Sequence, residues 1–268
     1  KKRMRHYVCQ DNSGMTSTAW LALETSTDTL SIAVARGDQT WHYSGAGAAQ
    51  SSPSMIPQSL ALLQQAGLAV ADLQAVVFGR GPGAFTGLRT SCAVAQGLAF
   101  GANLRVLPID TLLAVAEEAR YAQAQAGHAT SRVLAVMDAR MEQVYVAAYA
   151  FTPHVPNTAE PHALQGTWHC VQAPTLQSPE QLTWPAAWQS QDFVVAGNAY
   201  AVYGTRWPTT LHATQVAVLP TATALLRLAP QAWAQGQAVP PEEALPLYVR
   251  DKVAQTTEER MQAKAAAA

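Results

Sequence analysis

The chain has 268 residues, of which 49% are hydrophobic and 13% are charged, and its formal net charge at pH 7 is −1. This composition is typical of a folded protein with two compact domains or one large domain, and it excludes extensive disorder. Lysine occurs only near the two ends and the arginines are scattered singly, so the chain has no basic stripe that would hold a nucleic acid by itself.

The cysteines and the hydropathy indicate the compartment. Cys9, Cys92 and Cys170 are too few and too far apart for a disulfide framework or a zinc cluster, which fits a reducing cytoplasm. No apolar run reaches the ~18 residues that a membrane helix needs, and no signal peptide is recognisable. We therefore expect a cytoplasmic protein that makes no contact with a membrane.

Both ends of the chain differ from its middle. Residues 1–14 are polar and precede Met15, so we interpret them as a non-native or disordered extension. Residues 251–268, which end in a run of alanines, are interpreted as a C-terminal tail.

Between these ends the first half alternates strand and helix patterns. The expected strands are 20–23, 31–36 and 39–44, with a hairpin turn at Gly37 and Asp38. They are followed by a helix at 53–66, a strand at 75–79, a helix at 86–101, a strand at 105–109 and a helix that runs from Asp110 to about residue 125. The order is βββαβαβα.

After a polar linker at 126–131 the same order begins again. We expect strands at 133–137, 144–150 and 163–171, a short helix from Ser178, a strand at 193–196, a short helix, a weak strand at 216–219 and a long helix at 221–235. Two halves with one plan predict an α/β protein of two domains, residues 15–127 and 128–250, although no residue-level repeat supports this.

A glycine-dense turn stands out at 78–89 (FGRGPGAFTGLR), where a strand runs directly into a helix. Its glycines permit close approach of the backbone, and the N-terminus of the helix offers N–H groups that suit a phosphate. The spacing is neither that of a Walker A loop nor that of the dinucleotide fingerprint. A tight turn packed against a neighbouring backbone is the alternative.

Each half also has an acid at the end of its first strand, Glu24 in the first half and Asp138 in the second. Ligands of α/β sheets gather at the carboxyl ends of strands, so the two acids are candidates for a metal and nucleotide phosphates. Capping of local turns through backbone N–H groups is the alternative. The candidate nucleotide-facing residues are Glu24, Thr25, Gly81, Gly83, Thr86, Gly87 and Asp138.

Small residues dominate the helix expected at 86–101, among them Ala93 and Gly97. Such a surface lets a second helix approach closely, and that helix could belong to this chain or to a partner. Burial of the small face inside its own domain is the alternative.

Four segments together resemble the bacterial family of the tRNA threonylcarbamoyladenosine biosynthesis protein TsaB, also called YeaZ. They are residues 21–26 (LALETS), 79–89 (GRGPGAFTGLR), 95–99 (AQGLA) and 137–145 (MDARMEQVY), with a weaker match at 246–250 (PLYVR). The resemblance spans about residues 20–150. It implies a fold of two actin-like domains, as in actin, Hsp70 and the sugar kinases.

The resemblance also implies a part in placing threonylcarbamoyl on the adenosine beside the anticodon of tRNAs that read codons starting with A. It implies that the chain itself is not the catalyst. Its expected partner is a metal-dependent TsaD-type transferase, joined by a TsaE-type ATPase and an enzyme that makes threonylcarbamoyl-AMP. Contact with tRNA is expected only through the complex, and a homodimer is an alternative state of the chain alone.

The departures from the family pattern favour a partner role. The transferase relatives bind metal through His-x-x-x-His, whereas residues 50–57 read QSSPSMIP, and Ser51 stands where many TsaB relatives have a histidine. Glu24 stands where the family usually has aspartate. We expect no catalytic residues, no metal site and no required cofactor, while ATP with magnesium stays open. No zinc pair and no Ser-His-Asp set supports a peptidase.

Our leading hypothesis is a non-catalytic scaffold that docks the transferase through the helices expected at 53–66 and 86–101. The expected contact residues are Met55, Leu62, Arg89, Ala93, Gln96, Gly97 and Phe100. The alternative is a free-standing ATP-dependent phosphotransferase of the same fold, with Glu24 and Asp138 around magnesium.

Overall fold

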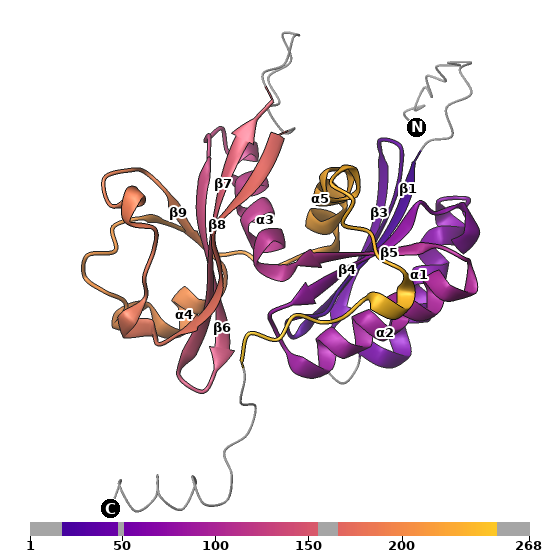
Figure 1. The fold of residues 1–268 in the computed structure, drawn as a ribbon, viewed down its shortest axis with the longest axis horizontal. Helices are drawn as coiled ribbons and strands as arrows, with labels where there is room; N and C mark the ends of the chain where they lie inside the picture. Colours follow the sequence, from indigo (N-terminus) through magenta and orange to yellow (C-terminus); the bar gives the residue numbers. More distant parts are fainter. Residues whose placement is uncertain (1–17, 48–50, 155–165, 251–268) are drawn as a thin grey trace, which may run out of the picture.

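A computed structural model describes residues 18–47, 51–154 and 166–250 (Figure 1). The predicted extension at 1–14 and the predicted tail at 251–268 lie outside the described residues. The first half contains β1 Ala19–Glu24, β2 Thr29–Arg36, β3 Gln39–Ala46, α1 Ser51–Gln65, a 3-10 turn at Val70–Asp72, β4 Ala75–Gly81, α2 Phe85–Gly101, β5 Arg105–Asp110 and α3 Thr111–Gln125. The predicted βββαβαβα order of this half is confirmed.

The second half is less regular than the first. It contains β6 Arg132–Arg140, β7 Gln143–Pro153, β8 Gly166–Gln177, 3-10 turns at Pro179–Gln181 and Ala186–Trp188, β9 Val194–Ala196, α4 Ala199–Tyr203, a 3-10 turn at Gly204–Arg206, β10 Thr214–Val216, α5 Ala222–Ala234 and a 3-10 turn at Pro241–Glu243. The weak strand predicted at 216–219 lies earlier, at β10. The strand predicted at 163–171 is the longer β8, and residues 163–165 lie outside the described residues.

The two halves share one strand topology. The first sheet has the order β3-β2-β1-β4-β5, and the second, counted from its other edge, has the equivalent order β8-β7-β6-β9-β10. In each sheet the first three strands pair antiparallel with one another. The next two strands extend the sheet from the other side of its first strand, and both run parallel to it. The two five-stranded mixed sheets confirm the predicted fold class and the duplicated plan, which the sequence supported only through element order.

The strand residues alternate between separate hydrophobic cores. Trp20 and Ala22 of β1 pack into the core between the two sheets, while Leu21 and Leu23 pack under α1 and α2 on the outer face. Successive side chains of a strand point to opposite faces, so a strand covered on both sides has no polar face. All six residues of β1 are accordingly buried.

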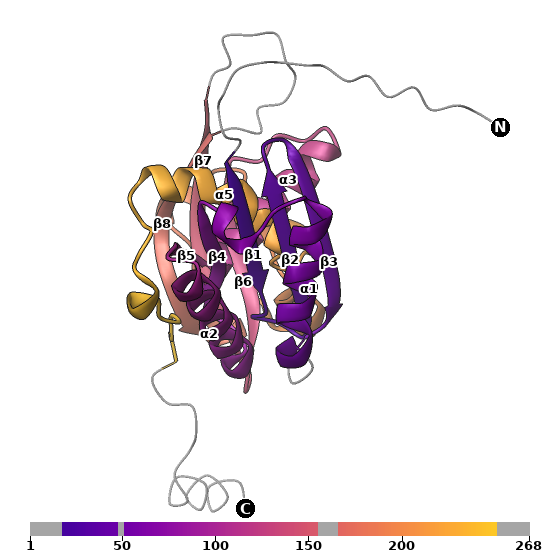
Figure 2. The same ribbon diagram turned by 90° about the vertical axis from the view of Figure 1, so that its right-hand side faces the viewer.

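Helices α3 and α5 lie between the two sheets and join the halves (Figures 1 and 2). Helix α3 comes from the first half but packs on β6 and β7, whereas α5 comes from the second half but packs across β1, β2, β4 and β5. One core cluster therefore contains residues of both sheets and both helices. The predicted boundary between residues 127 and 128 divides the strands of the two sheets, but the two halves share one packed core, and the boundary stays a prediction.

A buried carboxylate connects these two helices. Glu117 of α3 accepts hydrogen bonds from Arg120 Nε at 2.9 Å, from Arg227 Nε of α5 at 2.8 Å and from Trp168 Nε1 of β8 at 3.0 Å. The side chains of Glu117 and Arg120 are each 4% exposed. Glu118 pairs with Arg227 at 2.7 Å and accepts a hydrogen bond from Thr221, but its side chain is 21% exposed.

We predict that Glu117→Gln lowers the free energy of unfolding by about 3–5 kcal/mol, because removing one member of a buried ion pair leaves its partners poorly compensated. Glu118→Gln is the matched control and should cost about 1 kcal/mol or less, since its pair is partly solvated. Urea unfolding of both variants measures the difference. Equal losses would show that Glu117 has no special part in joining the halves.

Candidate functional site

The glycine-dense turn between β4 and α2 packs against the turn that follows β1. A Cβ built on Gly87 would lie 1.9 Å from the backbone oxygen of Thr25, and one on Gly83 would lie 2.5 Å from the Cβ of Ser26. Thr25 Oγ1 donates to the Gly87 carbonyl at 2.8 Å, and the Ala84 N–H donates to the Ser26 carbonyl at 2.7 Å. The alternative expected from sequence, a turn packed against a neighbouring backbone, thus accounts for both glycines, and their role toward a phosphate stays a prediction.

Gly81 has a separate reason to be glycine. Its φ of +114° lies in a region that residues with a side chain rarely adopt, and a Cβ there would meet the Leu247 carbonyl at 2.7 Å. Its N–H donates to Thr111 Oγ1 at 3.1 Å at the start of α3. The turn is therefore held between the first strand, α3 and the segment after α5.

Glu24 is buried beneath this turn, on the face of β1 that also carries Trp20 and Ala22. Glu24 is 1% exposed, and a Cβ added to Gly79 would lie 1.8 Å from Glu24 Oε2. Oε1 accepts from the Ser26 N–H at 2.6 Å, while Oε2 has no hydrogen-bond partner among the residues that the structure describes. Burial raises the pKa of Glu24, and the hydrogen bonds from Ser26 oppose this only in part.

Asp138 already has partners for both of its carboxylate oxygens. Oδ1 accepts from the Arg140 N–H at 2.8 Å and from the Tyr203 hydroxyl at 3.0 Å, and Oδ2 lies 3.4 Å from the Arg140 guanidinium. Burial raises the pKa of Tyr203, and its hydrogen bond to Asp138 adds to this. Glu24 and Asp138 each accept an N–H from the residue two positions on, so both cap local turns, the alternative that the sequence left open.

The halves meet at a small cavity of about 90 Å³ between the turn after β1 and the end of β6. Gly83 and Asp138 line it, together with Arg140, which bridges the halves through Asp28 Oδ2 at 3.0 Å. Glu24, Thr25, Gly81 and Gly87 are buried outside its wall, and Thr86 is exposed elsewhere.

The cavity at Asp138 is small for magnesium with ATP, whose binding stays a prediction. Small-molecule sites usually measure roughly 300–1,000 Å³, well above the cavity found here. Within 18–47, 51–154 and 166–250, no three His, Cys, Asp or Glu side chains come together so as to hold a metal ion.

No helix in the described part of the chain is long and apolar enough to cross a membrane.

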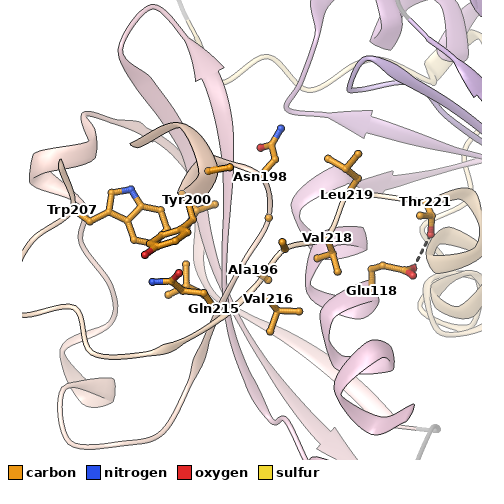
Figure 3. A pocket seen from close by; sticks show the side chains of 15 residues that line it. Glu118, Ala196, Asn198, Tyr200, Trp207, Gln215, Val216, Val218, Leu219 and Thr221 are labelled. Carbon is orange, nitrogen blue, oxygen red and sulfur yellow. Dashed lines mark hydrogen bonds between the residues drawn. The ribbon is translucent and has the colours of Figure 1, made fainter. Parts of the chain in front are cut away.

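A larger cavity, of about 660 Å³, lies beyond the carboxyl ends of β9 and β10 (Figure 3). Tyr200 and Trp207 stand on one side of it with their rings edge to face at 5.1 Å, and the hydrogen-bonded pair of Glu118 and Thr221 stands on the other. Nothing in the sequence pattern indicated this cavity. None of the predicted site residues lines it.

The predicted partner residues on α1 and α2 fall into three groups. Met55 is 0% exposed and Leu62 is 5% exposed, and both pack in the core under the first sheet, so the prediction that they contact a partner is wrong for these two side chains. Ala93 and Gly97 are exposed, and Phe100 is 79% exposed. The alternative of burial within the domain therefore holds for the inner face of α2 only.

Arg89 and Gln96, the third group, contact the segment after α5. Gln96 Nε2 donates to the Ala244 carbonyl at 3.0 Å, and Arg89 Nε donates to the Tyr248 hydroxyl at 3.0 Å. The Arg89 guanidinium also lies 3.8 Å from the centroid of the Phe85 ring. The sequence offered one hint of this segment, the weak family match at 246–250, but not its position along α2.

Two glycines of α2 give a matched prediction. Gly87→Ala should destabilise the protein by about 1–3 kcal/mol, because the new Cβ overlaps the Thr25 backbone. Gly97→Ala should instead stabilise it by about 0.5–1 kcal/mol, because nothing lies within 4 Å and alanine favours the helix. The melting temperatures of both variants test this. A lower melting temperature for Gly97→Ala would contradict the free space around Gly97.

Glu24 predicts a pH dependence. Because its folded pKa is raised, its neutral form favours folding, so this contribution is present below the unfolded pKa of 4.5 and is lost as pH rises through the folded pKa. Glu24→Gln should match the parent protein near pH 4 and exceed its stability at pH 7, by about 1.4 kcal/mol per unit of raised pKa. Urea unfolding across pH, with the exposed Glu242→Gln as control, measures it. A variant less stable at pH 7 would contradict the raised pKa.

Comparison with known proteins identifies relatives of this chain. Residues 47–257 match the family model described as TsaD: tRNA N6-adenosine threonylcarbamoyltransferase. The chain is 32% identical to a tRNA threonylcarbamoyladenosine biosynthesis protein TsaB of Haemophilus influenzae, over 87% of this chain and 94% of that protein. It is 30% identical to the Escherichia coli K12 protein of the same name, over 87% and 95%.

Among solved structures, the chain is similar to YeaZ from Pseudomonas aeruginosa, with a TM-score of 0.74, 34% identity, and coverage of 86% of this chain and 99% of that one. The likeness extends over both sheets and nearly the whole length of these relatives. The TsaD match lies within the same actin-like superfamily. On this evidence the chain belongs to the TsaB (YeaZ) family.

Proposed function

We propose that this chain acts in tRNA threonylcarbamoyladenosine biosynthesis as a non-catalytic scaffold that docks a TsaD-type transferase. The observation that carries the proposal is the outer surface of α1 and α2. On α1, Ile56 is 43% exposed and Leu60 is 47% exposed; on α2, Phe100 is 79% exposed and the small residues Ala93 and Gly97 are also exposed. Exposed apolar side chains gathered on neighbouring helices are typical of a protein interface.

The helix pair suits a helical partner in particular. Ala93 and Gly97 lie one turn apart on α2 and so share a face, and a Cβ added to Gly97 would meet nothing within 4 Å. A partner helix can therefore approach α2 closely on this face, beside the exposed Phe100 one turn further along α2. A second copy of this chain could use the same surface, so a homodimer of the chain alone competes with the transferase in this proposal.

The surroundings of Asp138 support a scaffold better than a phosphotransferase. The cavity beside Asp138 measures about 90 Å³, and both oxygens of Asp138 are paired within the chain. We propose that the chain needs no cofactor of its own and contacts tRNA only in the complex, with a TsaE-type ATPase as a further partner in the cytoplasm. Docking then acts on the transferase through the difference in affinity of this chain for its two states.

Reconstitution of the tRNA modification, with the transferase, the ATPase and the enzyme that makes threonylcarbamoyl-AMP, tests the role. We expect product only when this chain is present, and none from the chain alone. Undiminished modification without it would overturn the scaffold, and ATP-dependent turnover by the chain alone would support the phosphotransferase instead.

We predict that Gly97→Leu weakens binding of the transferase tenfold or more while leaving the chain folded. Overpacking a close contact costs about 1–3 kcal/mol, and 1.4 kcal/mol corresponds to a factor of ten. The matched control is Ala124→Leu, which adds similar bulk to an exposed site on α3 away from the surface. Calorimetric titration measures affinity, and the melting temperature measures folding. Full affinity in a folded Gly97→Leu variant would remove α2 from the interface.

A further inference from the structure

A second space between the halves lies on the side of β5 and β8, away from the small cavity at Asp138. It has a volume of about 570 Å³, which is in the usual range for a small-molecule site. Its walls come from the ends of β4 and β5, from β7 and β8, and from the C-terminal half of α5. No residue of the proposed docking surface lines it.

Tyr149 of β7 forms part of this cavity and has an unsatisfied hydroxyl. Tyr149 is 2% exposed, and its hydroxyl is buried with no hydrogen-bond partner among the described residues. A buried polar group without a partner is costly, and such groups call for an explanation such as a missing ligand. Burial raises the pKa of Tyr149 well above its usual value, and the nearby Asp110 carboxylate adds to this.

Opposite Tyr149 lies an ion pair with unused capacity. Arg80 Nε donates to Asp110 Oδ1 at 2.5 Å, and the two side chains are 40% and 20% exposed. In the described part of the chain, no hydrogen bond uses the terminal amino groups of Arg80 or Oδ2 of Asp110. One cation and one anion thus offer free donors and a free acceptor side by side.

The remaining walls are mixed. Ile109, Leu113 and Leu228 contribute aliphatic surface. The amide of Gln231 is held by the backbone of Trp168, which donates to its Oε1 at 3.2 Å and accepts from its Nε2 at 3.3 Å. Further polar side chains also line the cavity, namely His169, Cys170, Gln235 and Gln237. The cavity therefore combines a balanced charge pair, one buried hydroxyl and an aliphatic wall with additional polar groups at its edge.

We propose that this cavity binds a small aliphatic α-amino acid as a zwitterion, with its carboxylate on Arg80 and Tyr149, its ammonium group on Asp110 and its side chain on the aliphatic wall. A ligand with both charges matches a site whose own charges are balanced. The terminal amino groups of arginine suit a carboxylate because they present parallel donors. The Tyr149 hydroxyl then gains the partner that it lacks.

Calorimetric titration of the full chain with three matched probes tests the charges. L-Leucine carries both charged groups, 4-methylpentanoate lacks the ammonium group and 3-methylbutylamine lacks the carboxylate. We expect L-leucine to bind and each of the other two to bind at least tenfold more weakly. Absence of L-leucine binding at millimolar concentration overturns the proposal, and so does equal binding of 4-methylpentanoate.

Tyr149→Phe separates a ligand site from a structural role, because its two effects have opposite signs. Removing an unsatisfied buried hydroxyl should leave the melting temperature of the free protein unchanged or raise it, while L-leucine binding weakens about tenfold. Arg80→Gln should abolish binding, with folding checked by circular dichroism. The matched controls, Tyr43→Phe and Arg132→Gln, lie outside the cavity and should keep full affinity. Unchanged binding in Tyr149→Phe overturns the assignment of the hydroxyl and with it the proposal.

Discussion

The buried carboxylate of Glu117 is the interaction on which the arrangement of the two halves depends. It holds α3 to α5 through Arg227 and to the second sheet through Trp168, in the middle of a core shared by both sheets. A carboxylate in that position is tolerated only because its hydrogen-bonding capacity is used by donors, two of which carry charge. Since each helix packs on the sheet of the other half, the halves cannot separate without opening this core.

The same close packing leaves only a small cavity beside Asp138, of about 90 Å³. The glycines that could admit a phosphate instead admit the backbone at Thr25 and Ser26. Arg140 spans the remaining gap to Asp28, and its guanidinium also neutralises Asp138. Because the acids are paired and the turn is filled, the proposed docking of a partner is placed on the outer helices α1 and α2. This is the physical reason for placing the proposed function on α1 and α2.

The segment after α5 has an unexpected structural part. It returns across the first half, pairs with β5 through Val239 and Val106, and places the Ala244 carbonyl where Cys92 and Gln96 of α2 donate to it. Tyr248 then extends the helix surface beside Phe85 and Arg89. A partner that binds α2 therefore also meets residues from the far end of the described chain. The proposed docking surface on α2 therefore includes residues of both halves.

The sequence by itself determined the order of the elements, the fold class and the family, because alternation, glycine turns and motif spacing are local properties of the chain. It also singled out α2 by its small residues, but it left open whether their face is buried or exposed. It could not tell which face of α1 points inward, so Met55 and Leu62 were assigned to an interface although they are core residues. Only the tertiary structure decided that Glu24 is buried while Asp138 reaches the space between the halves, since two acids at equivalent strand ends look alike in sequence. Only the tertiary structure brought Arg80, Asp110 and Tyr149 around one cavity, because contacts between residues far apart in the chain depend on how the two sheets are packed.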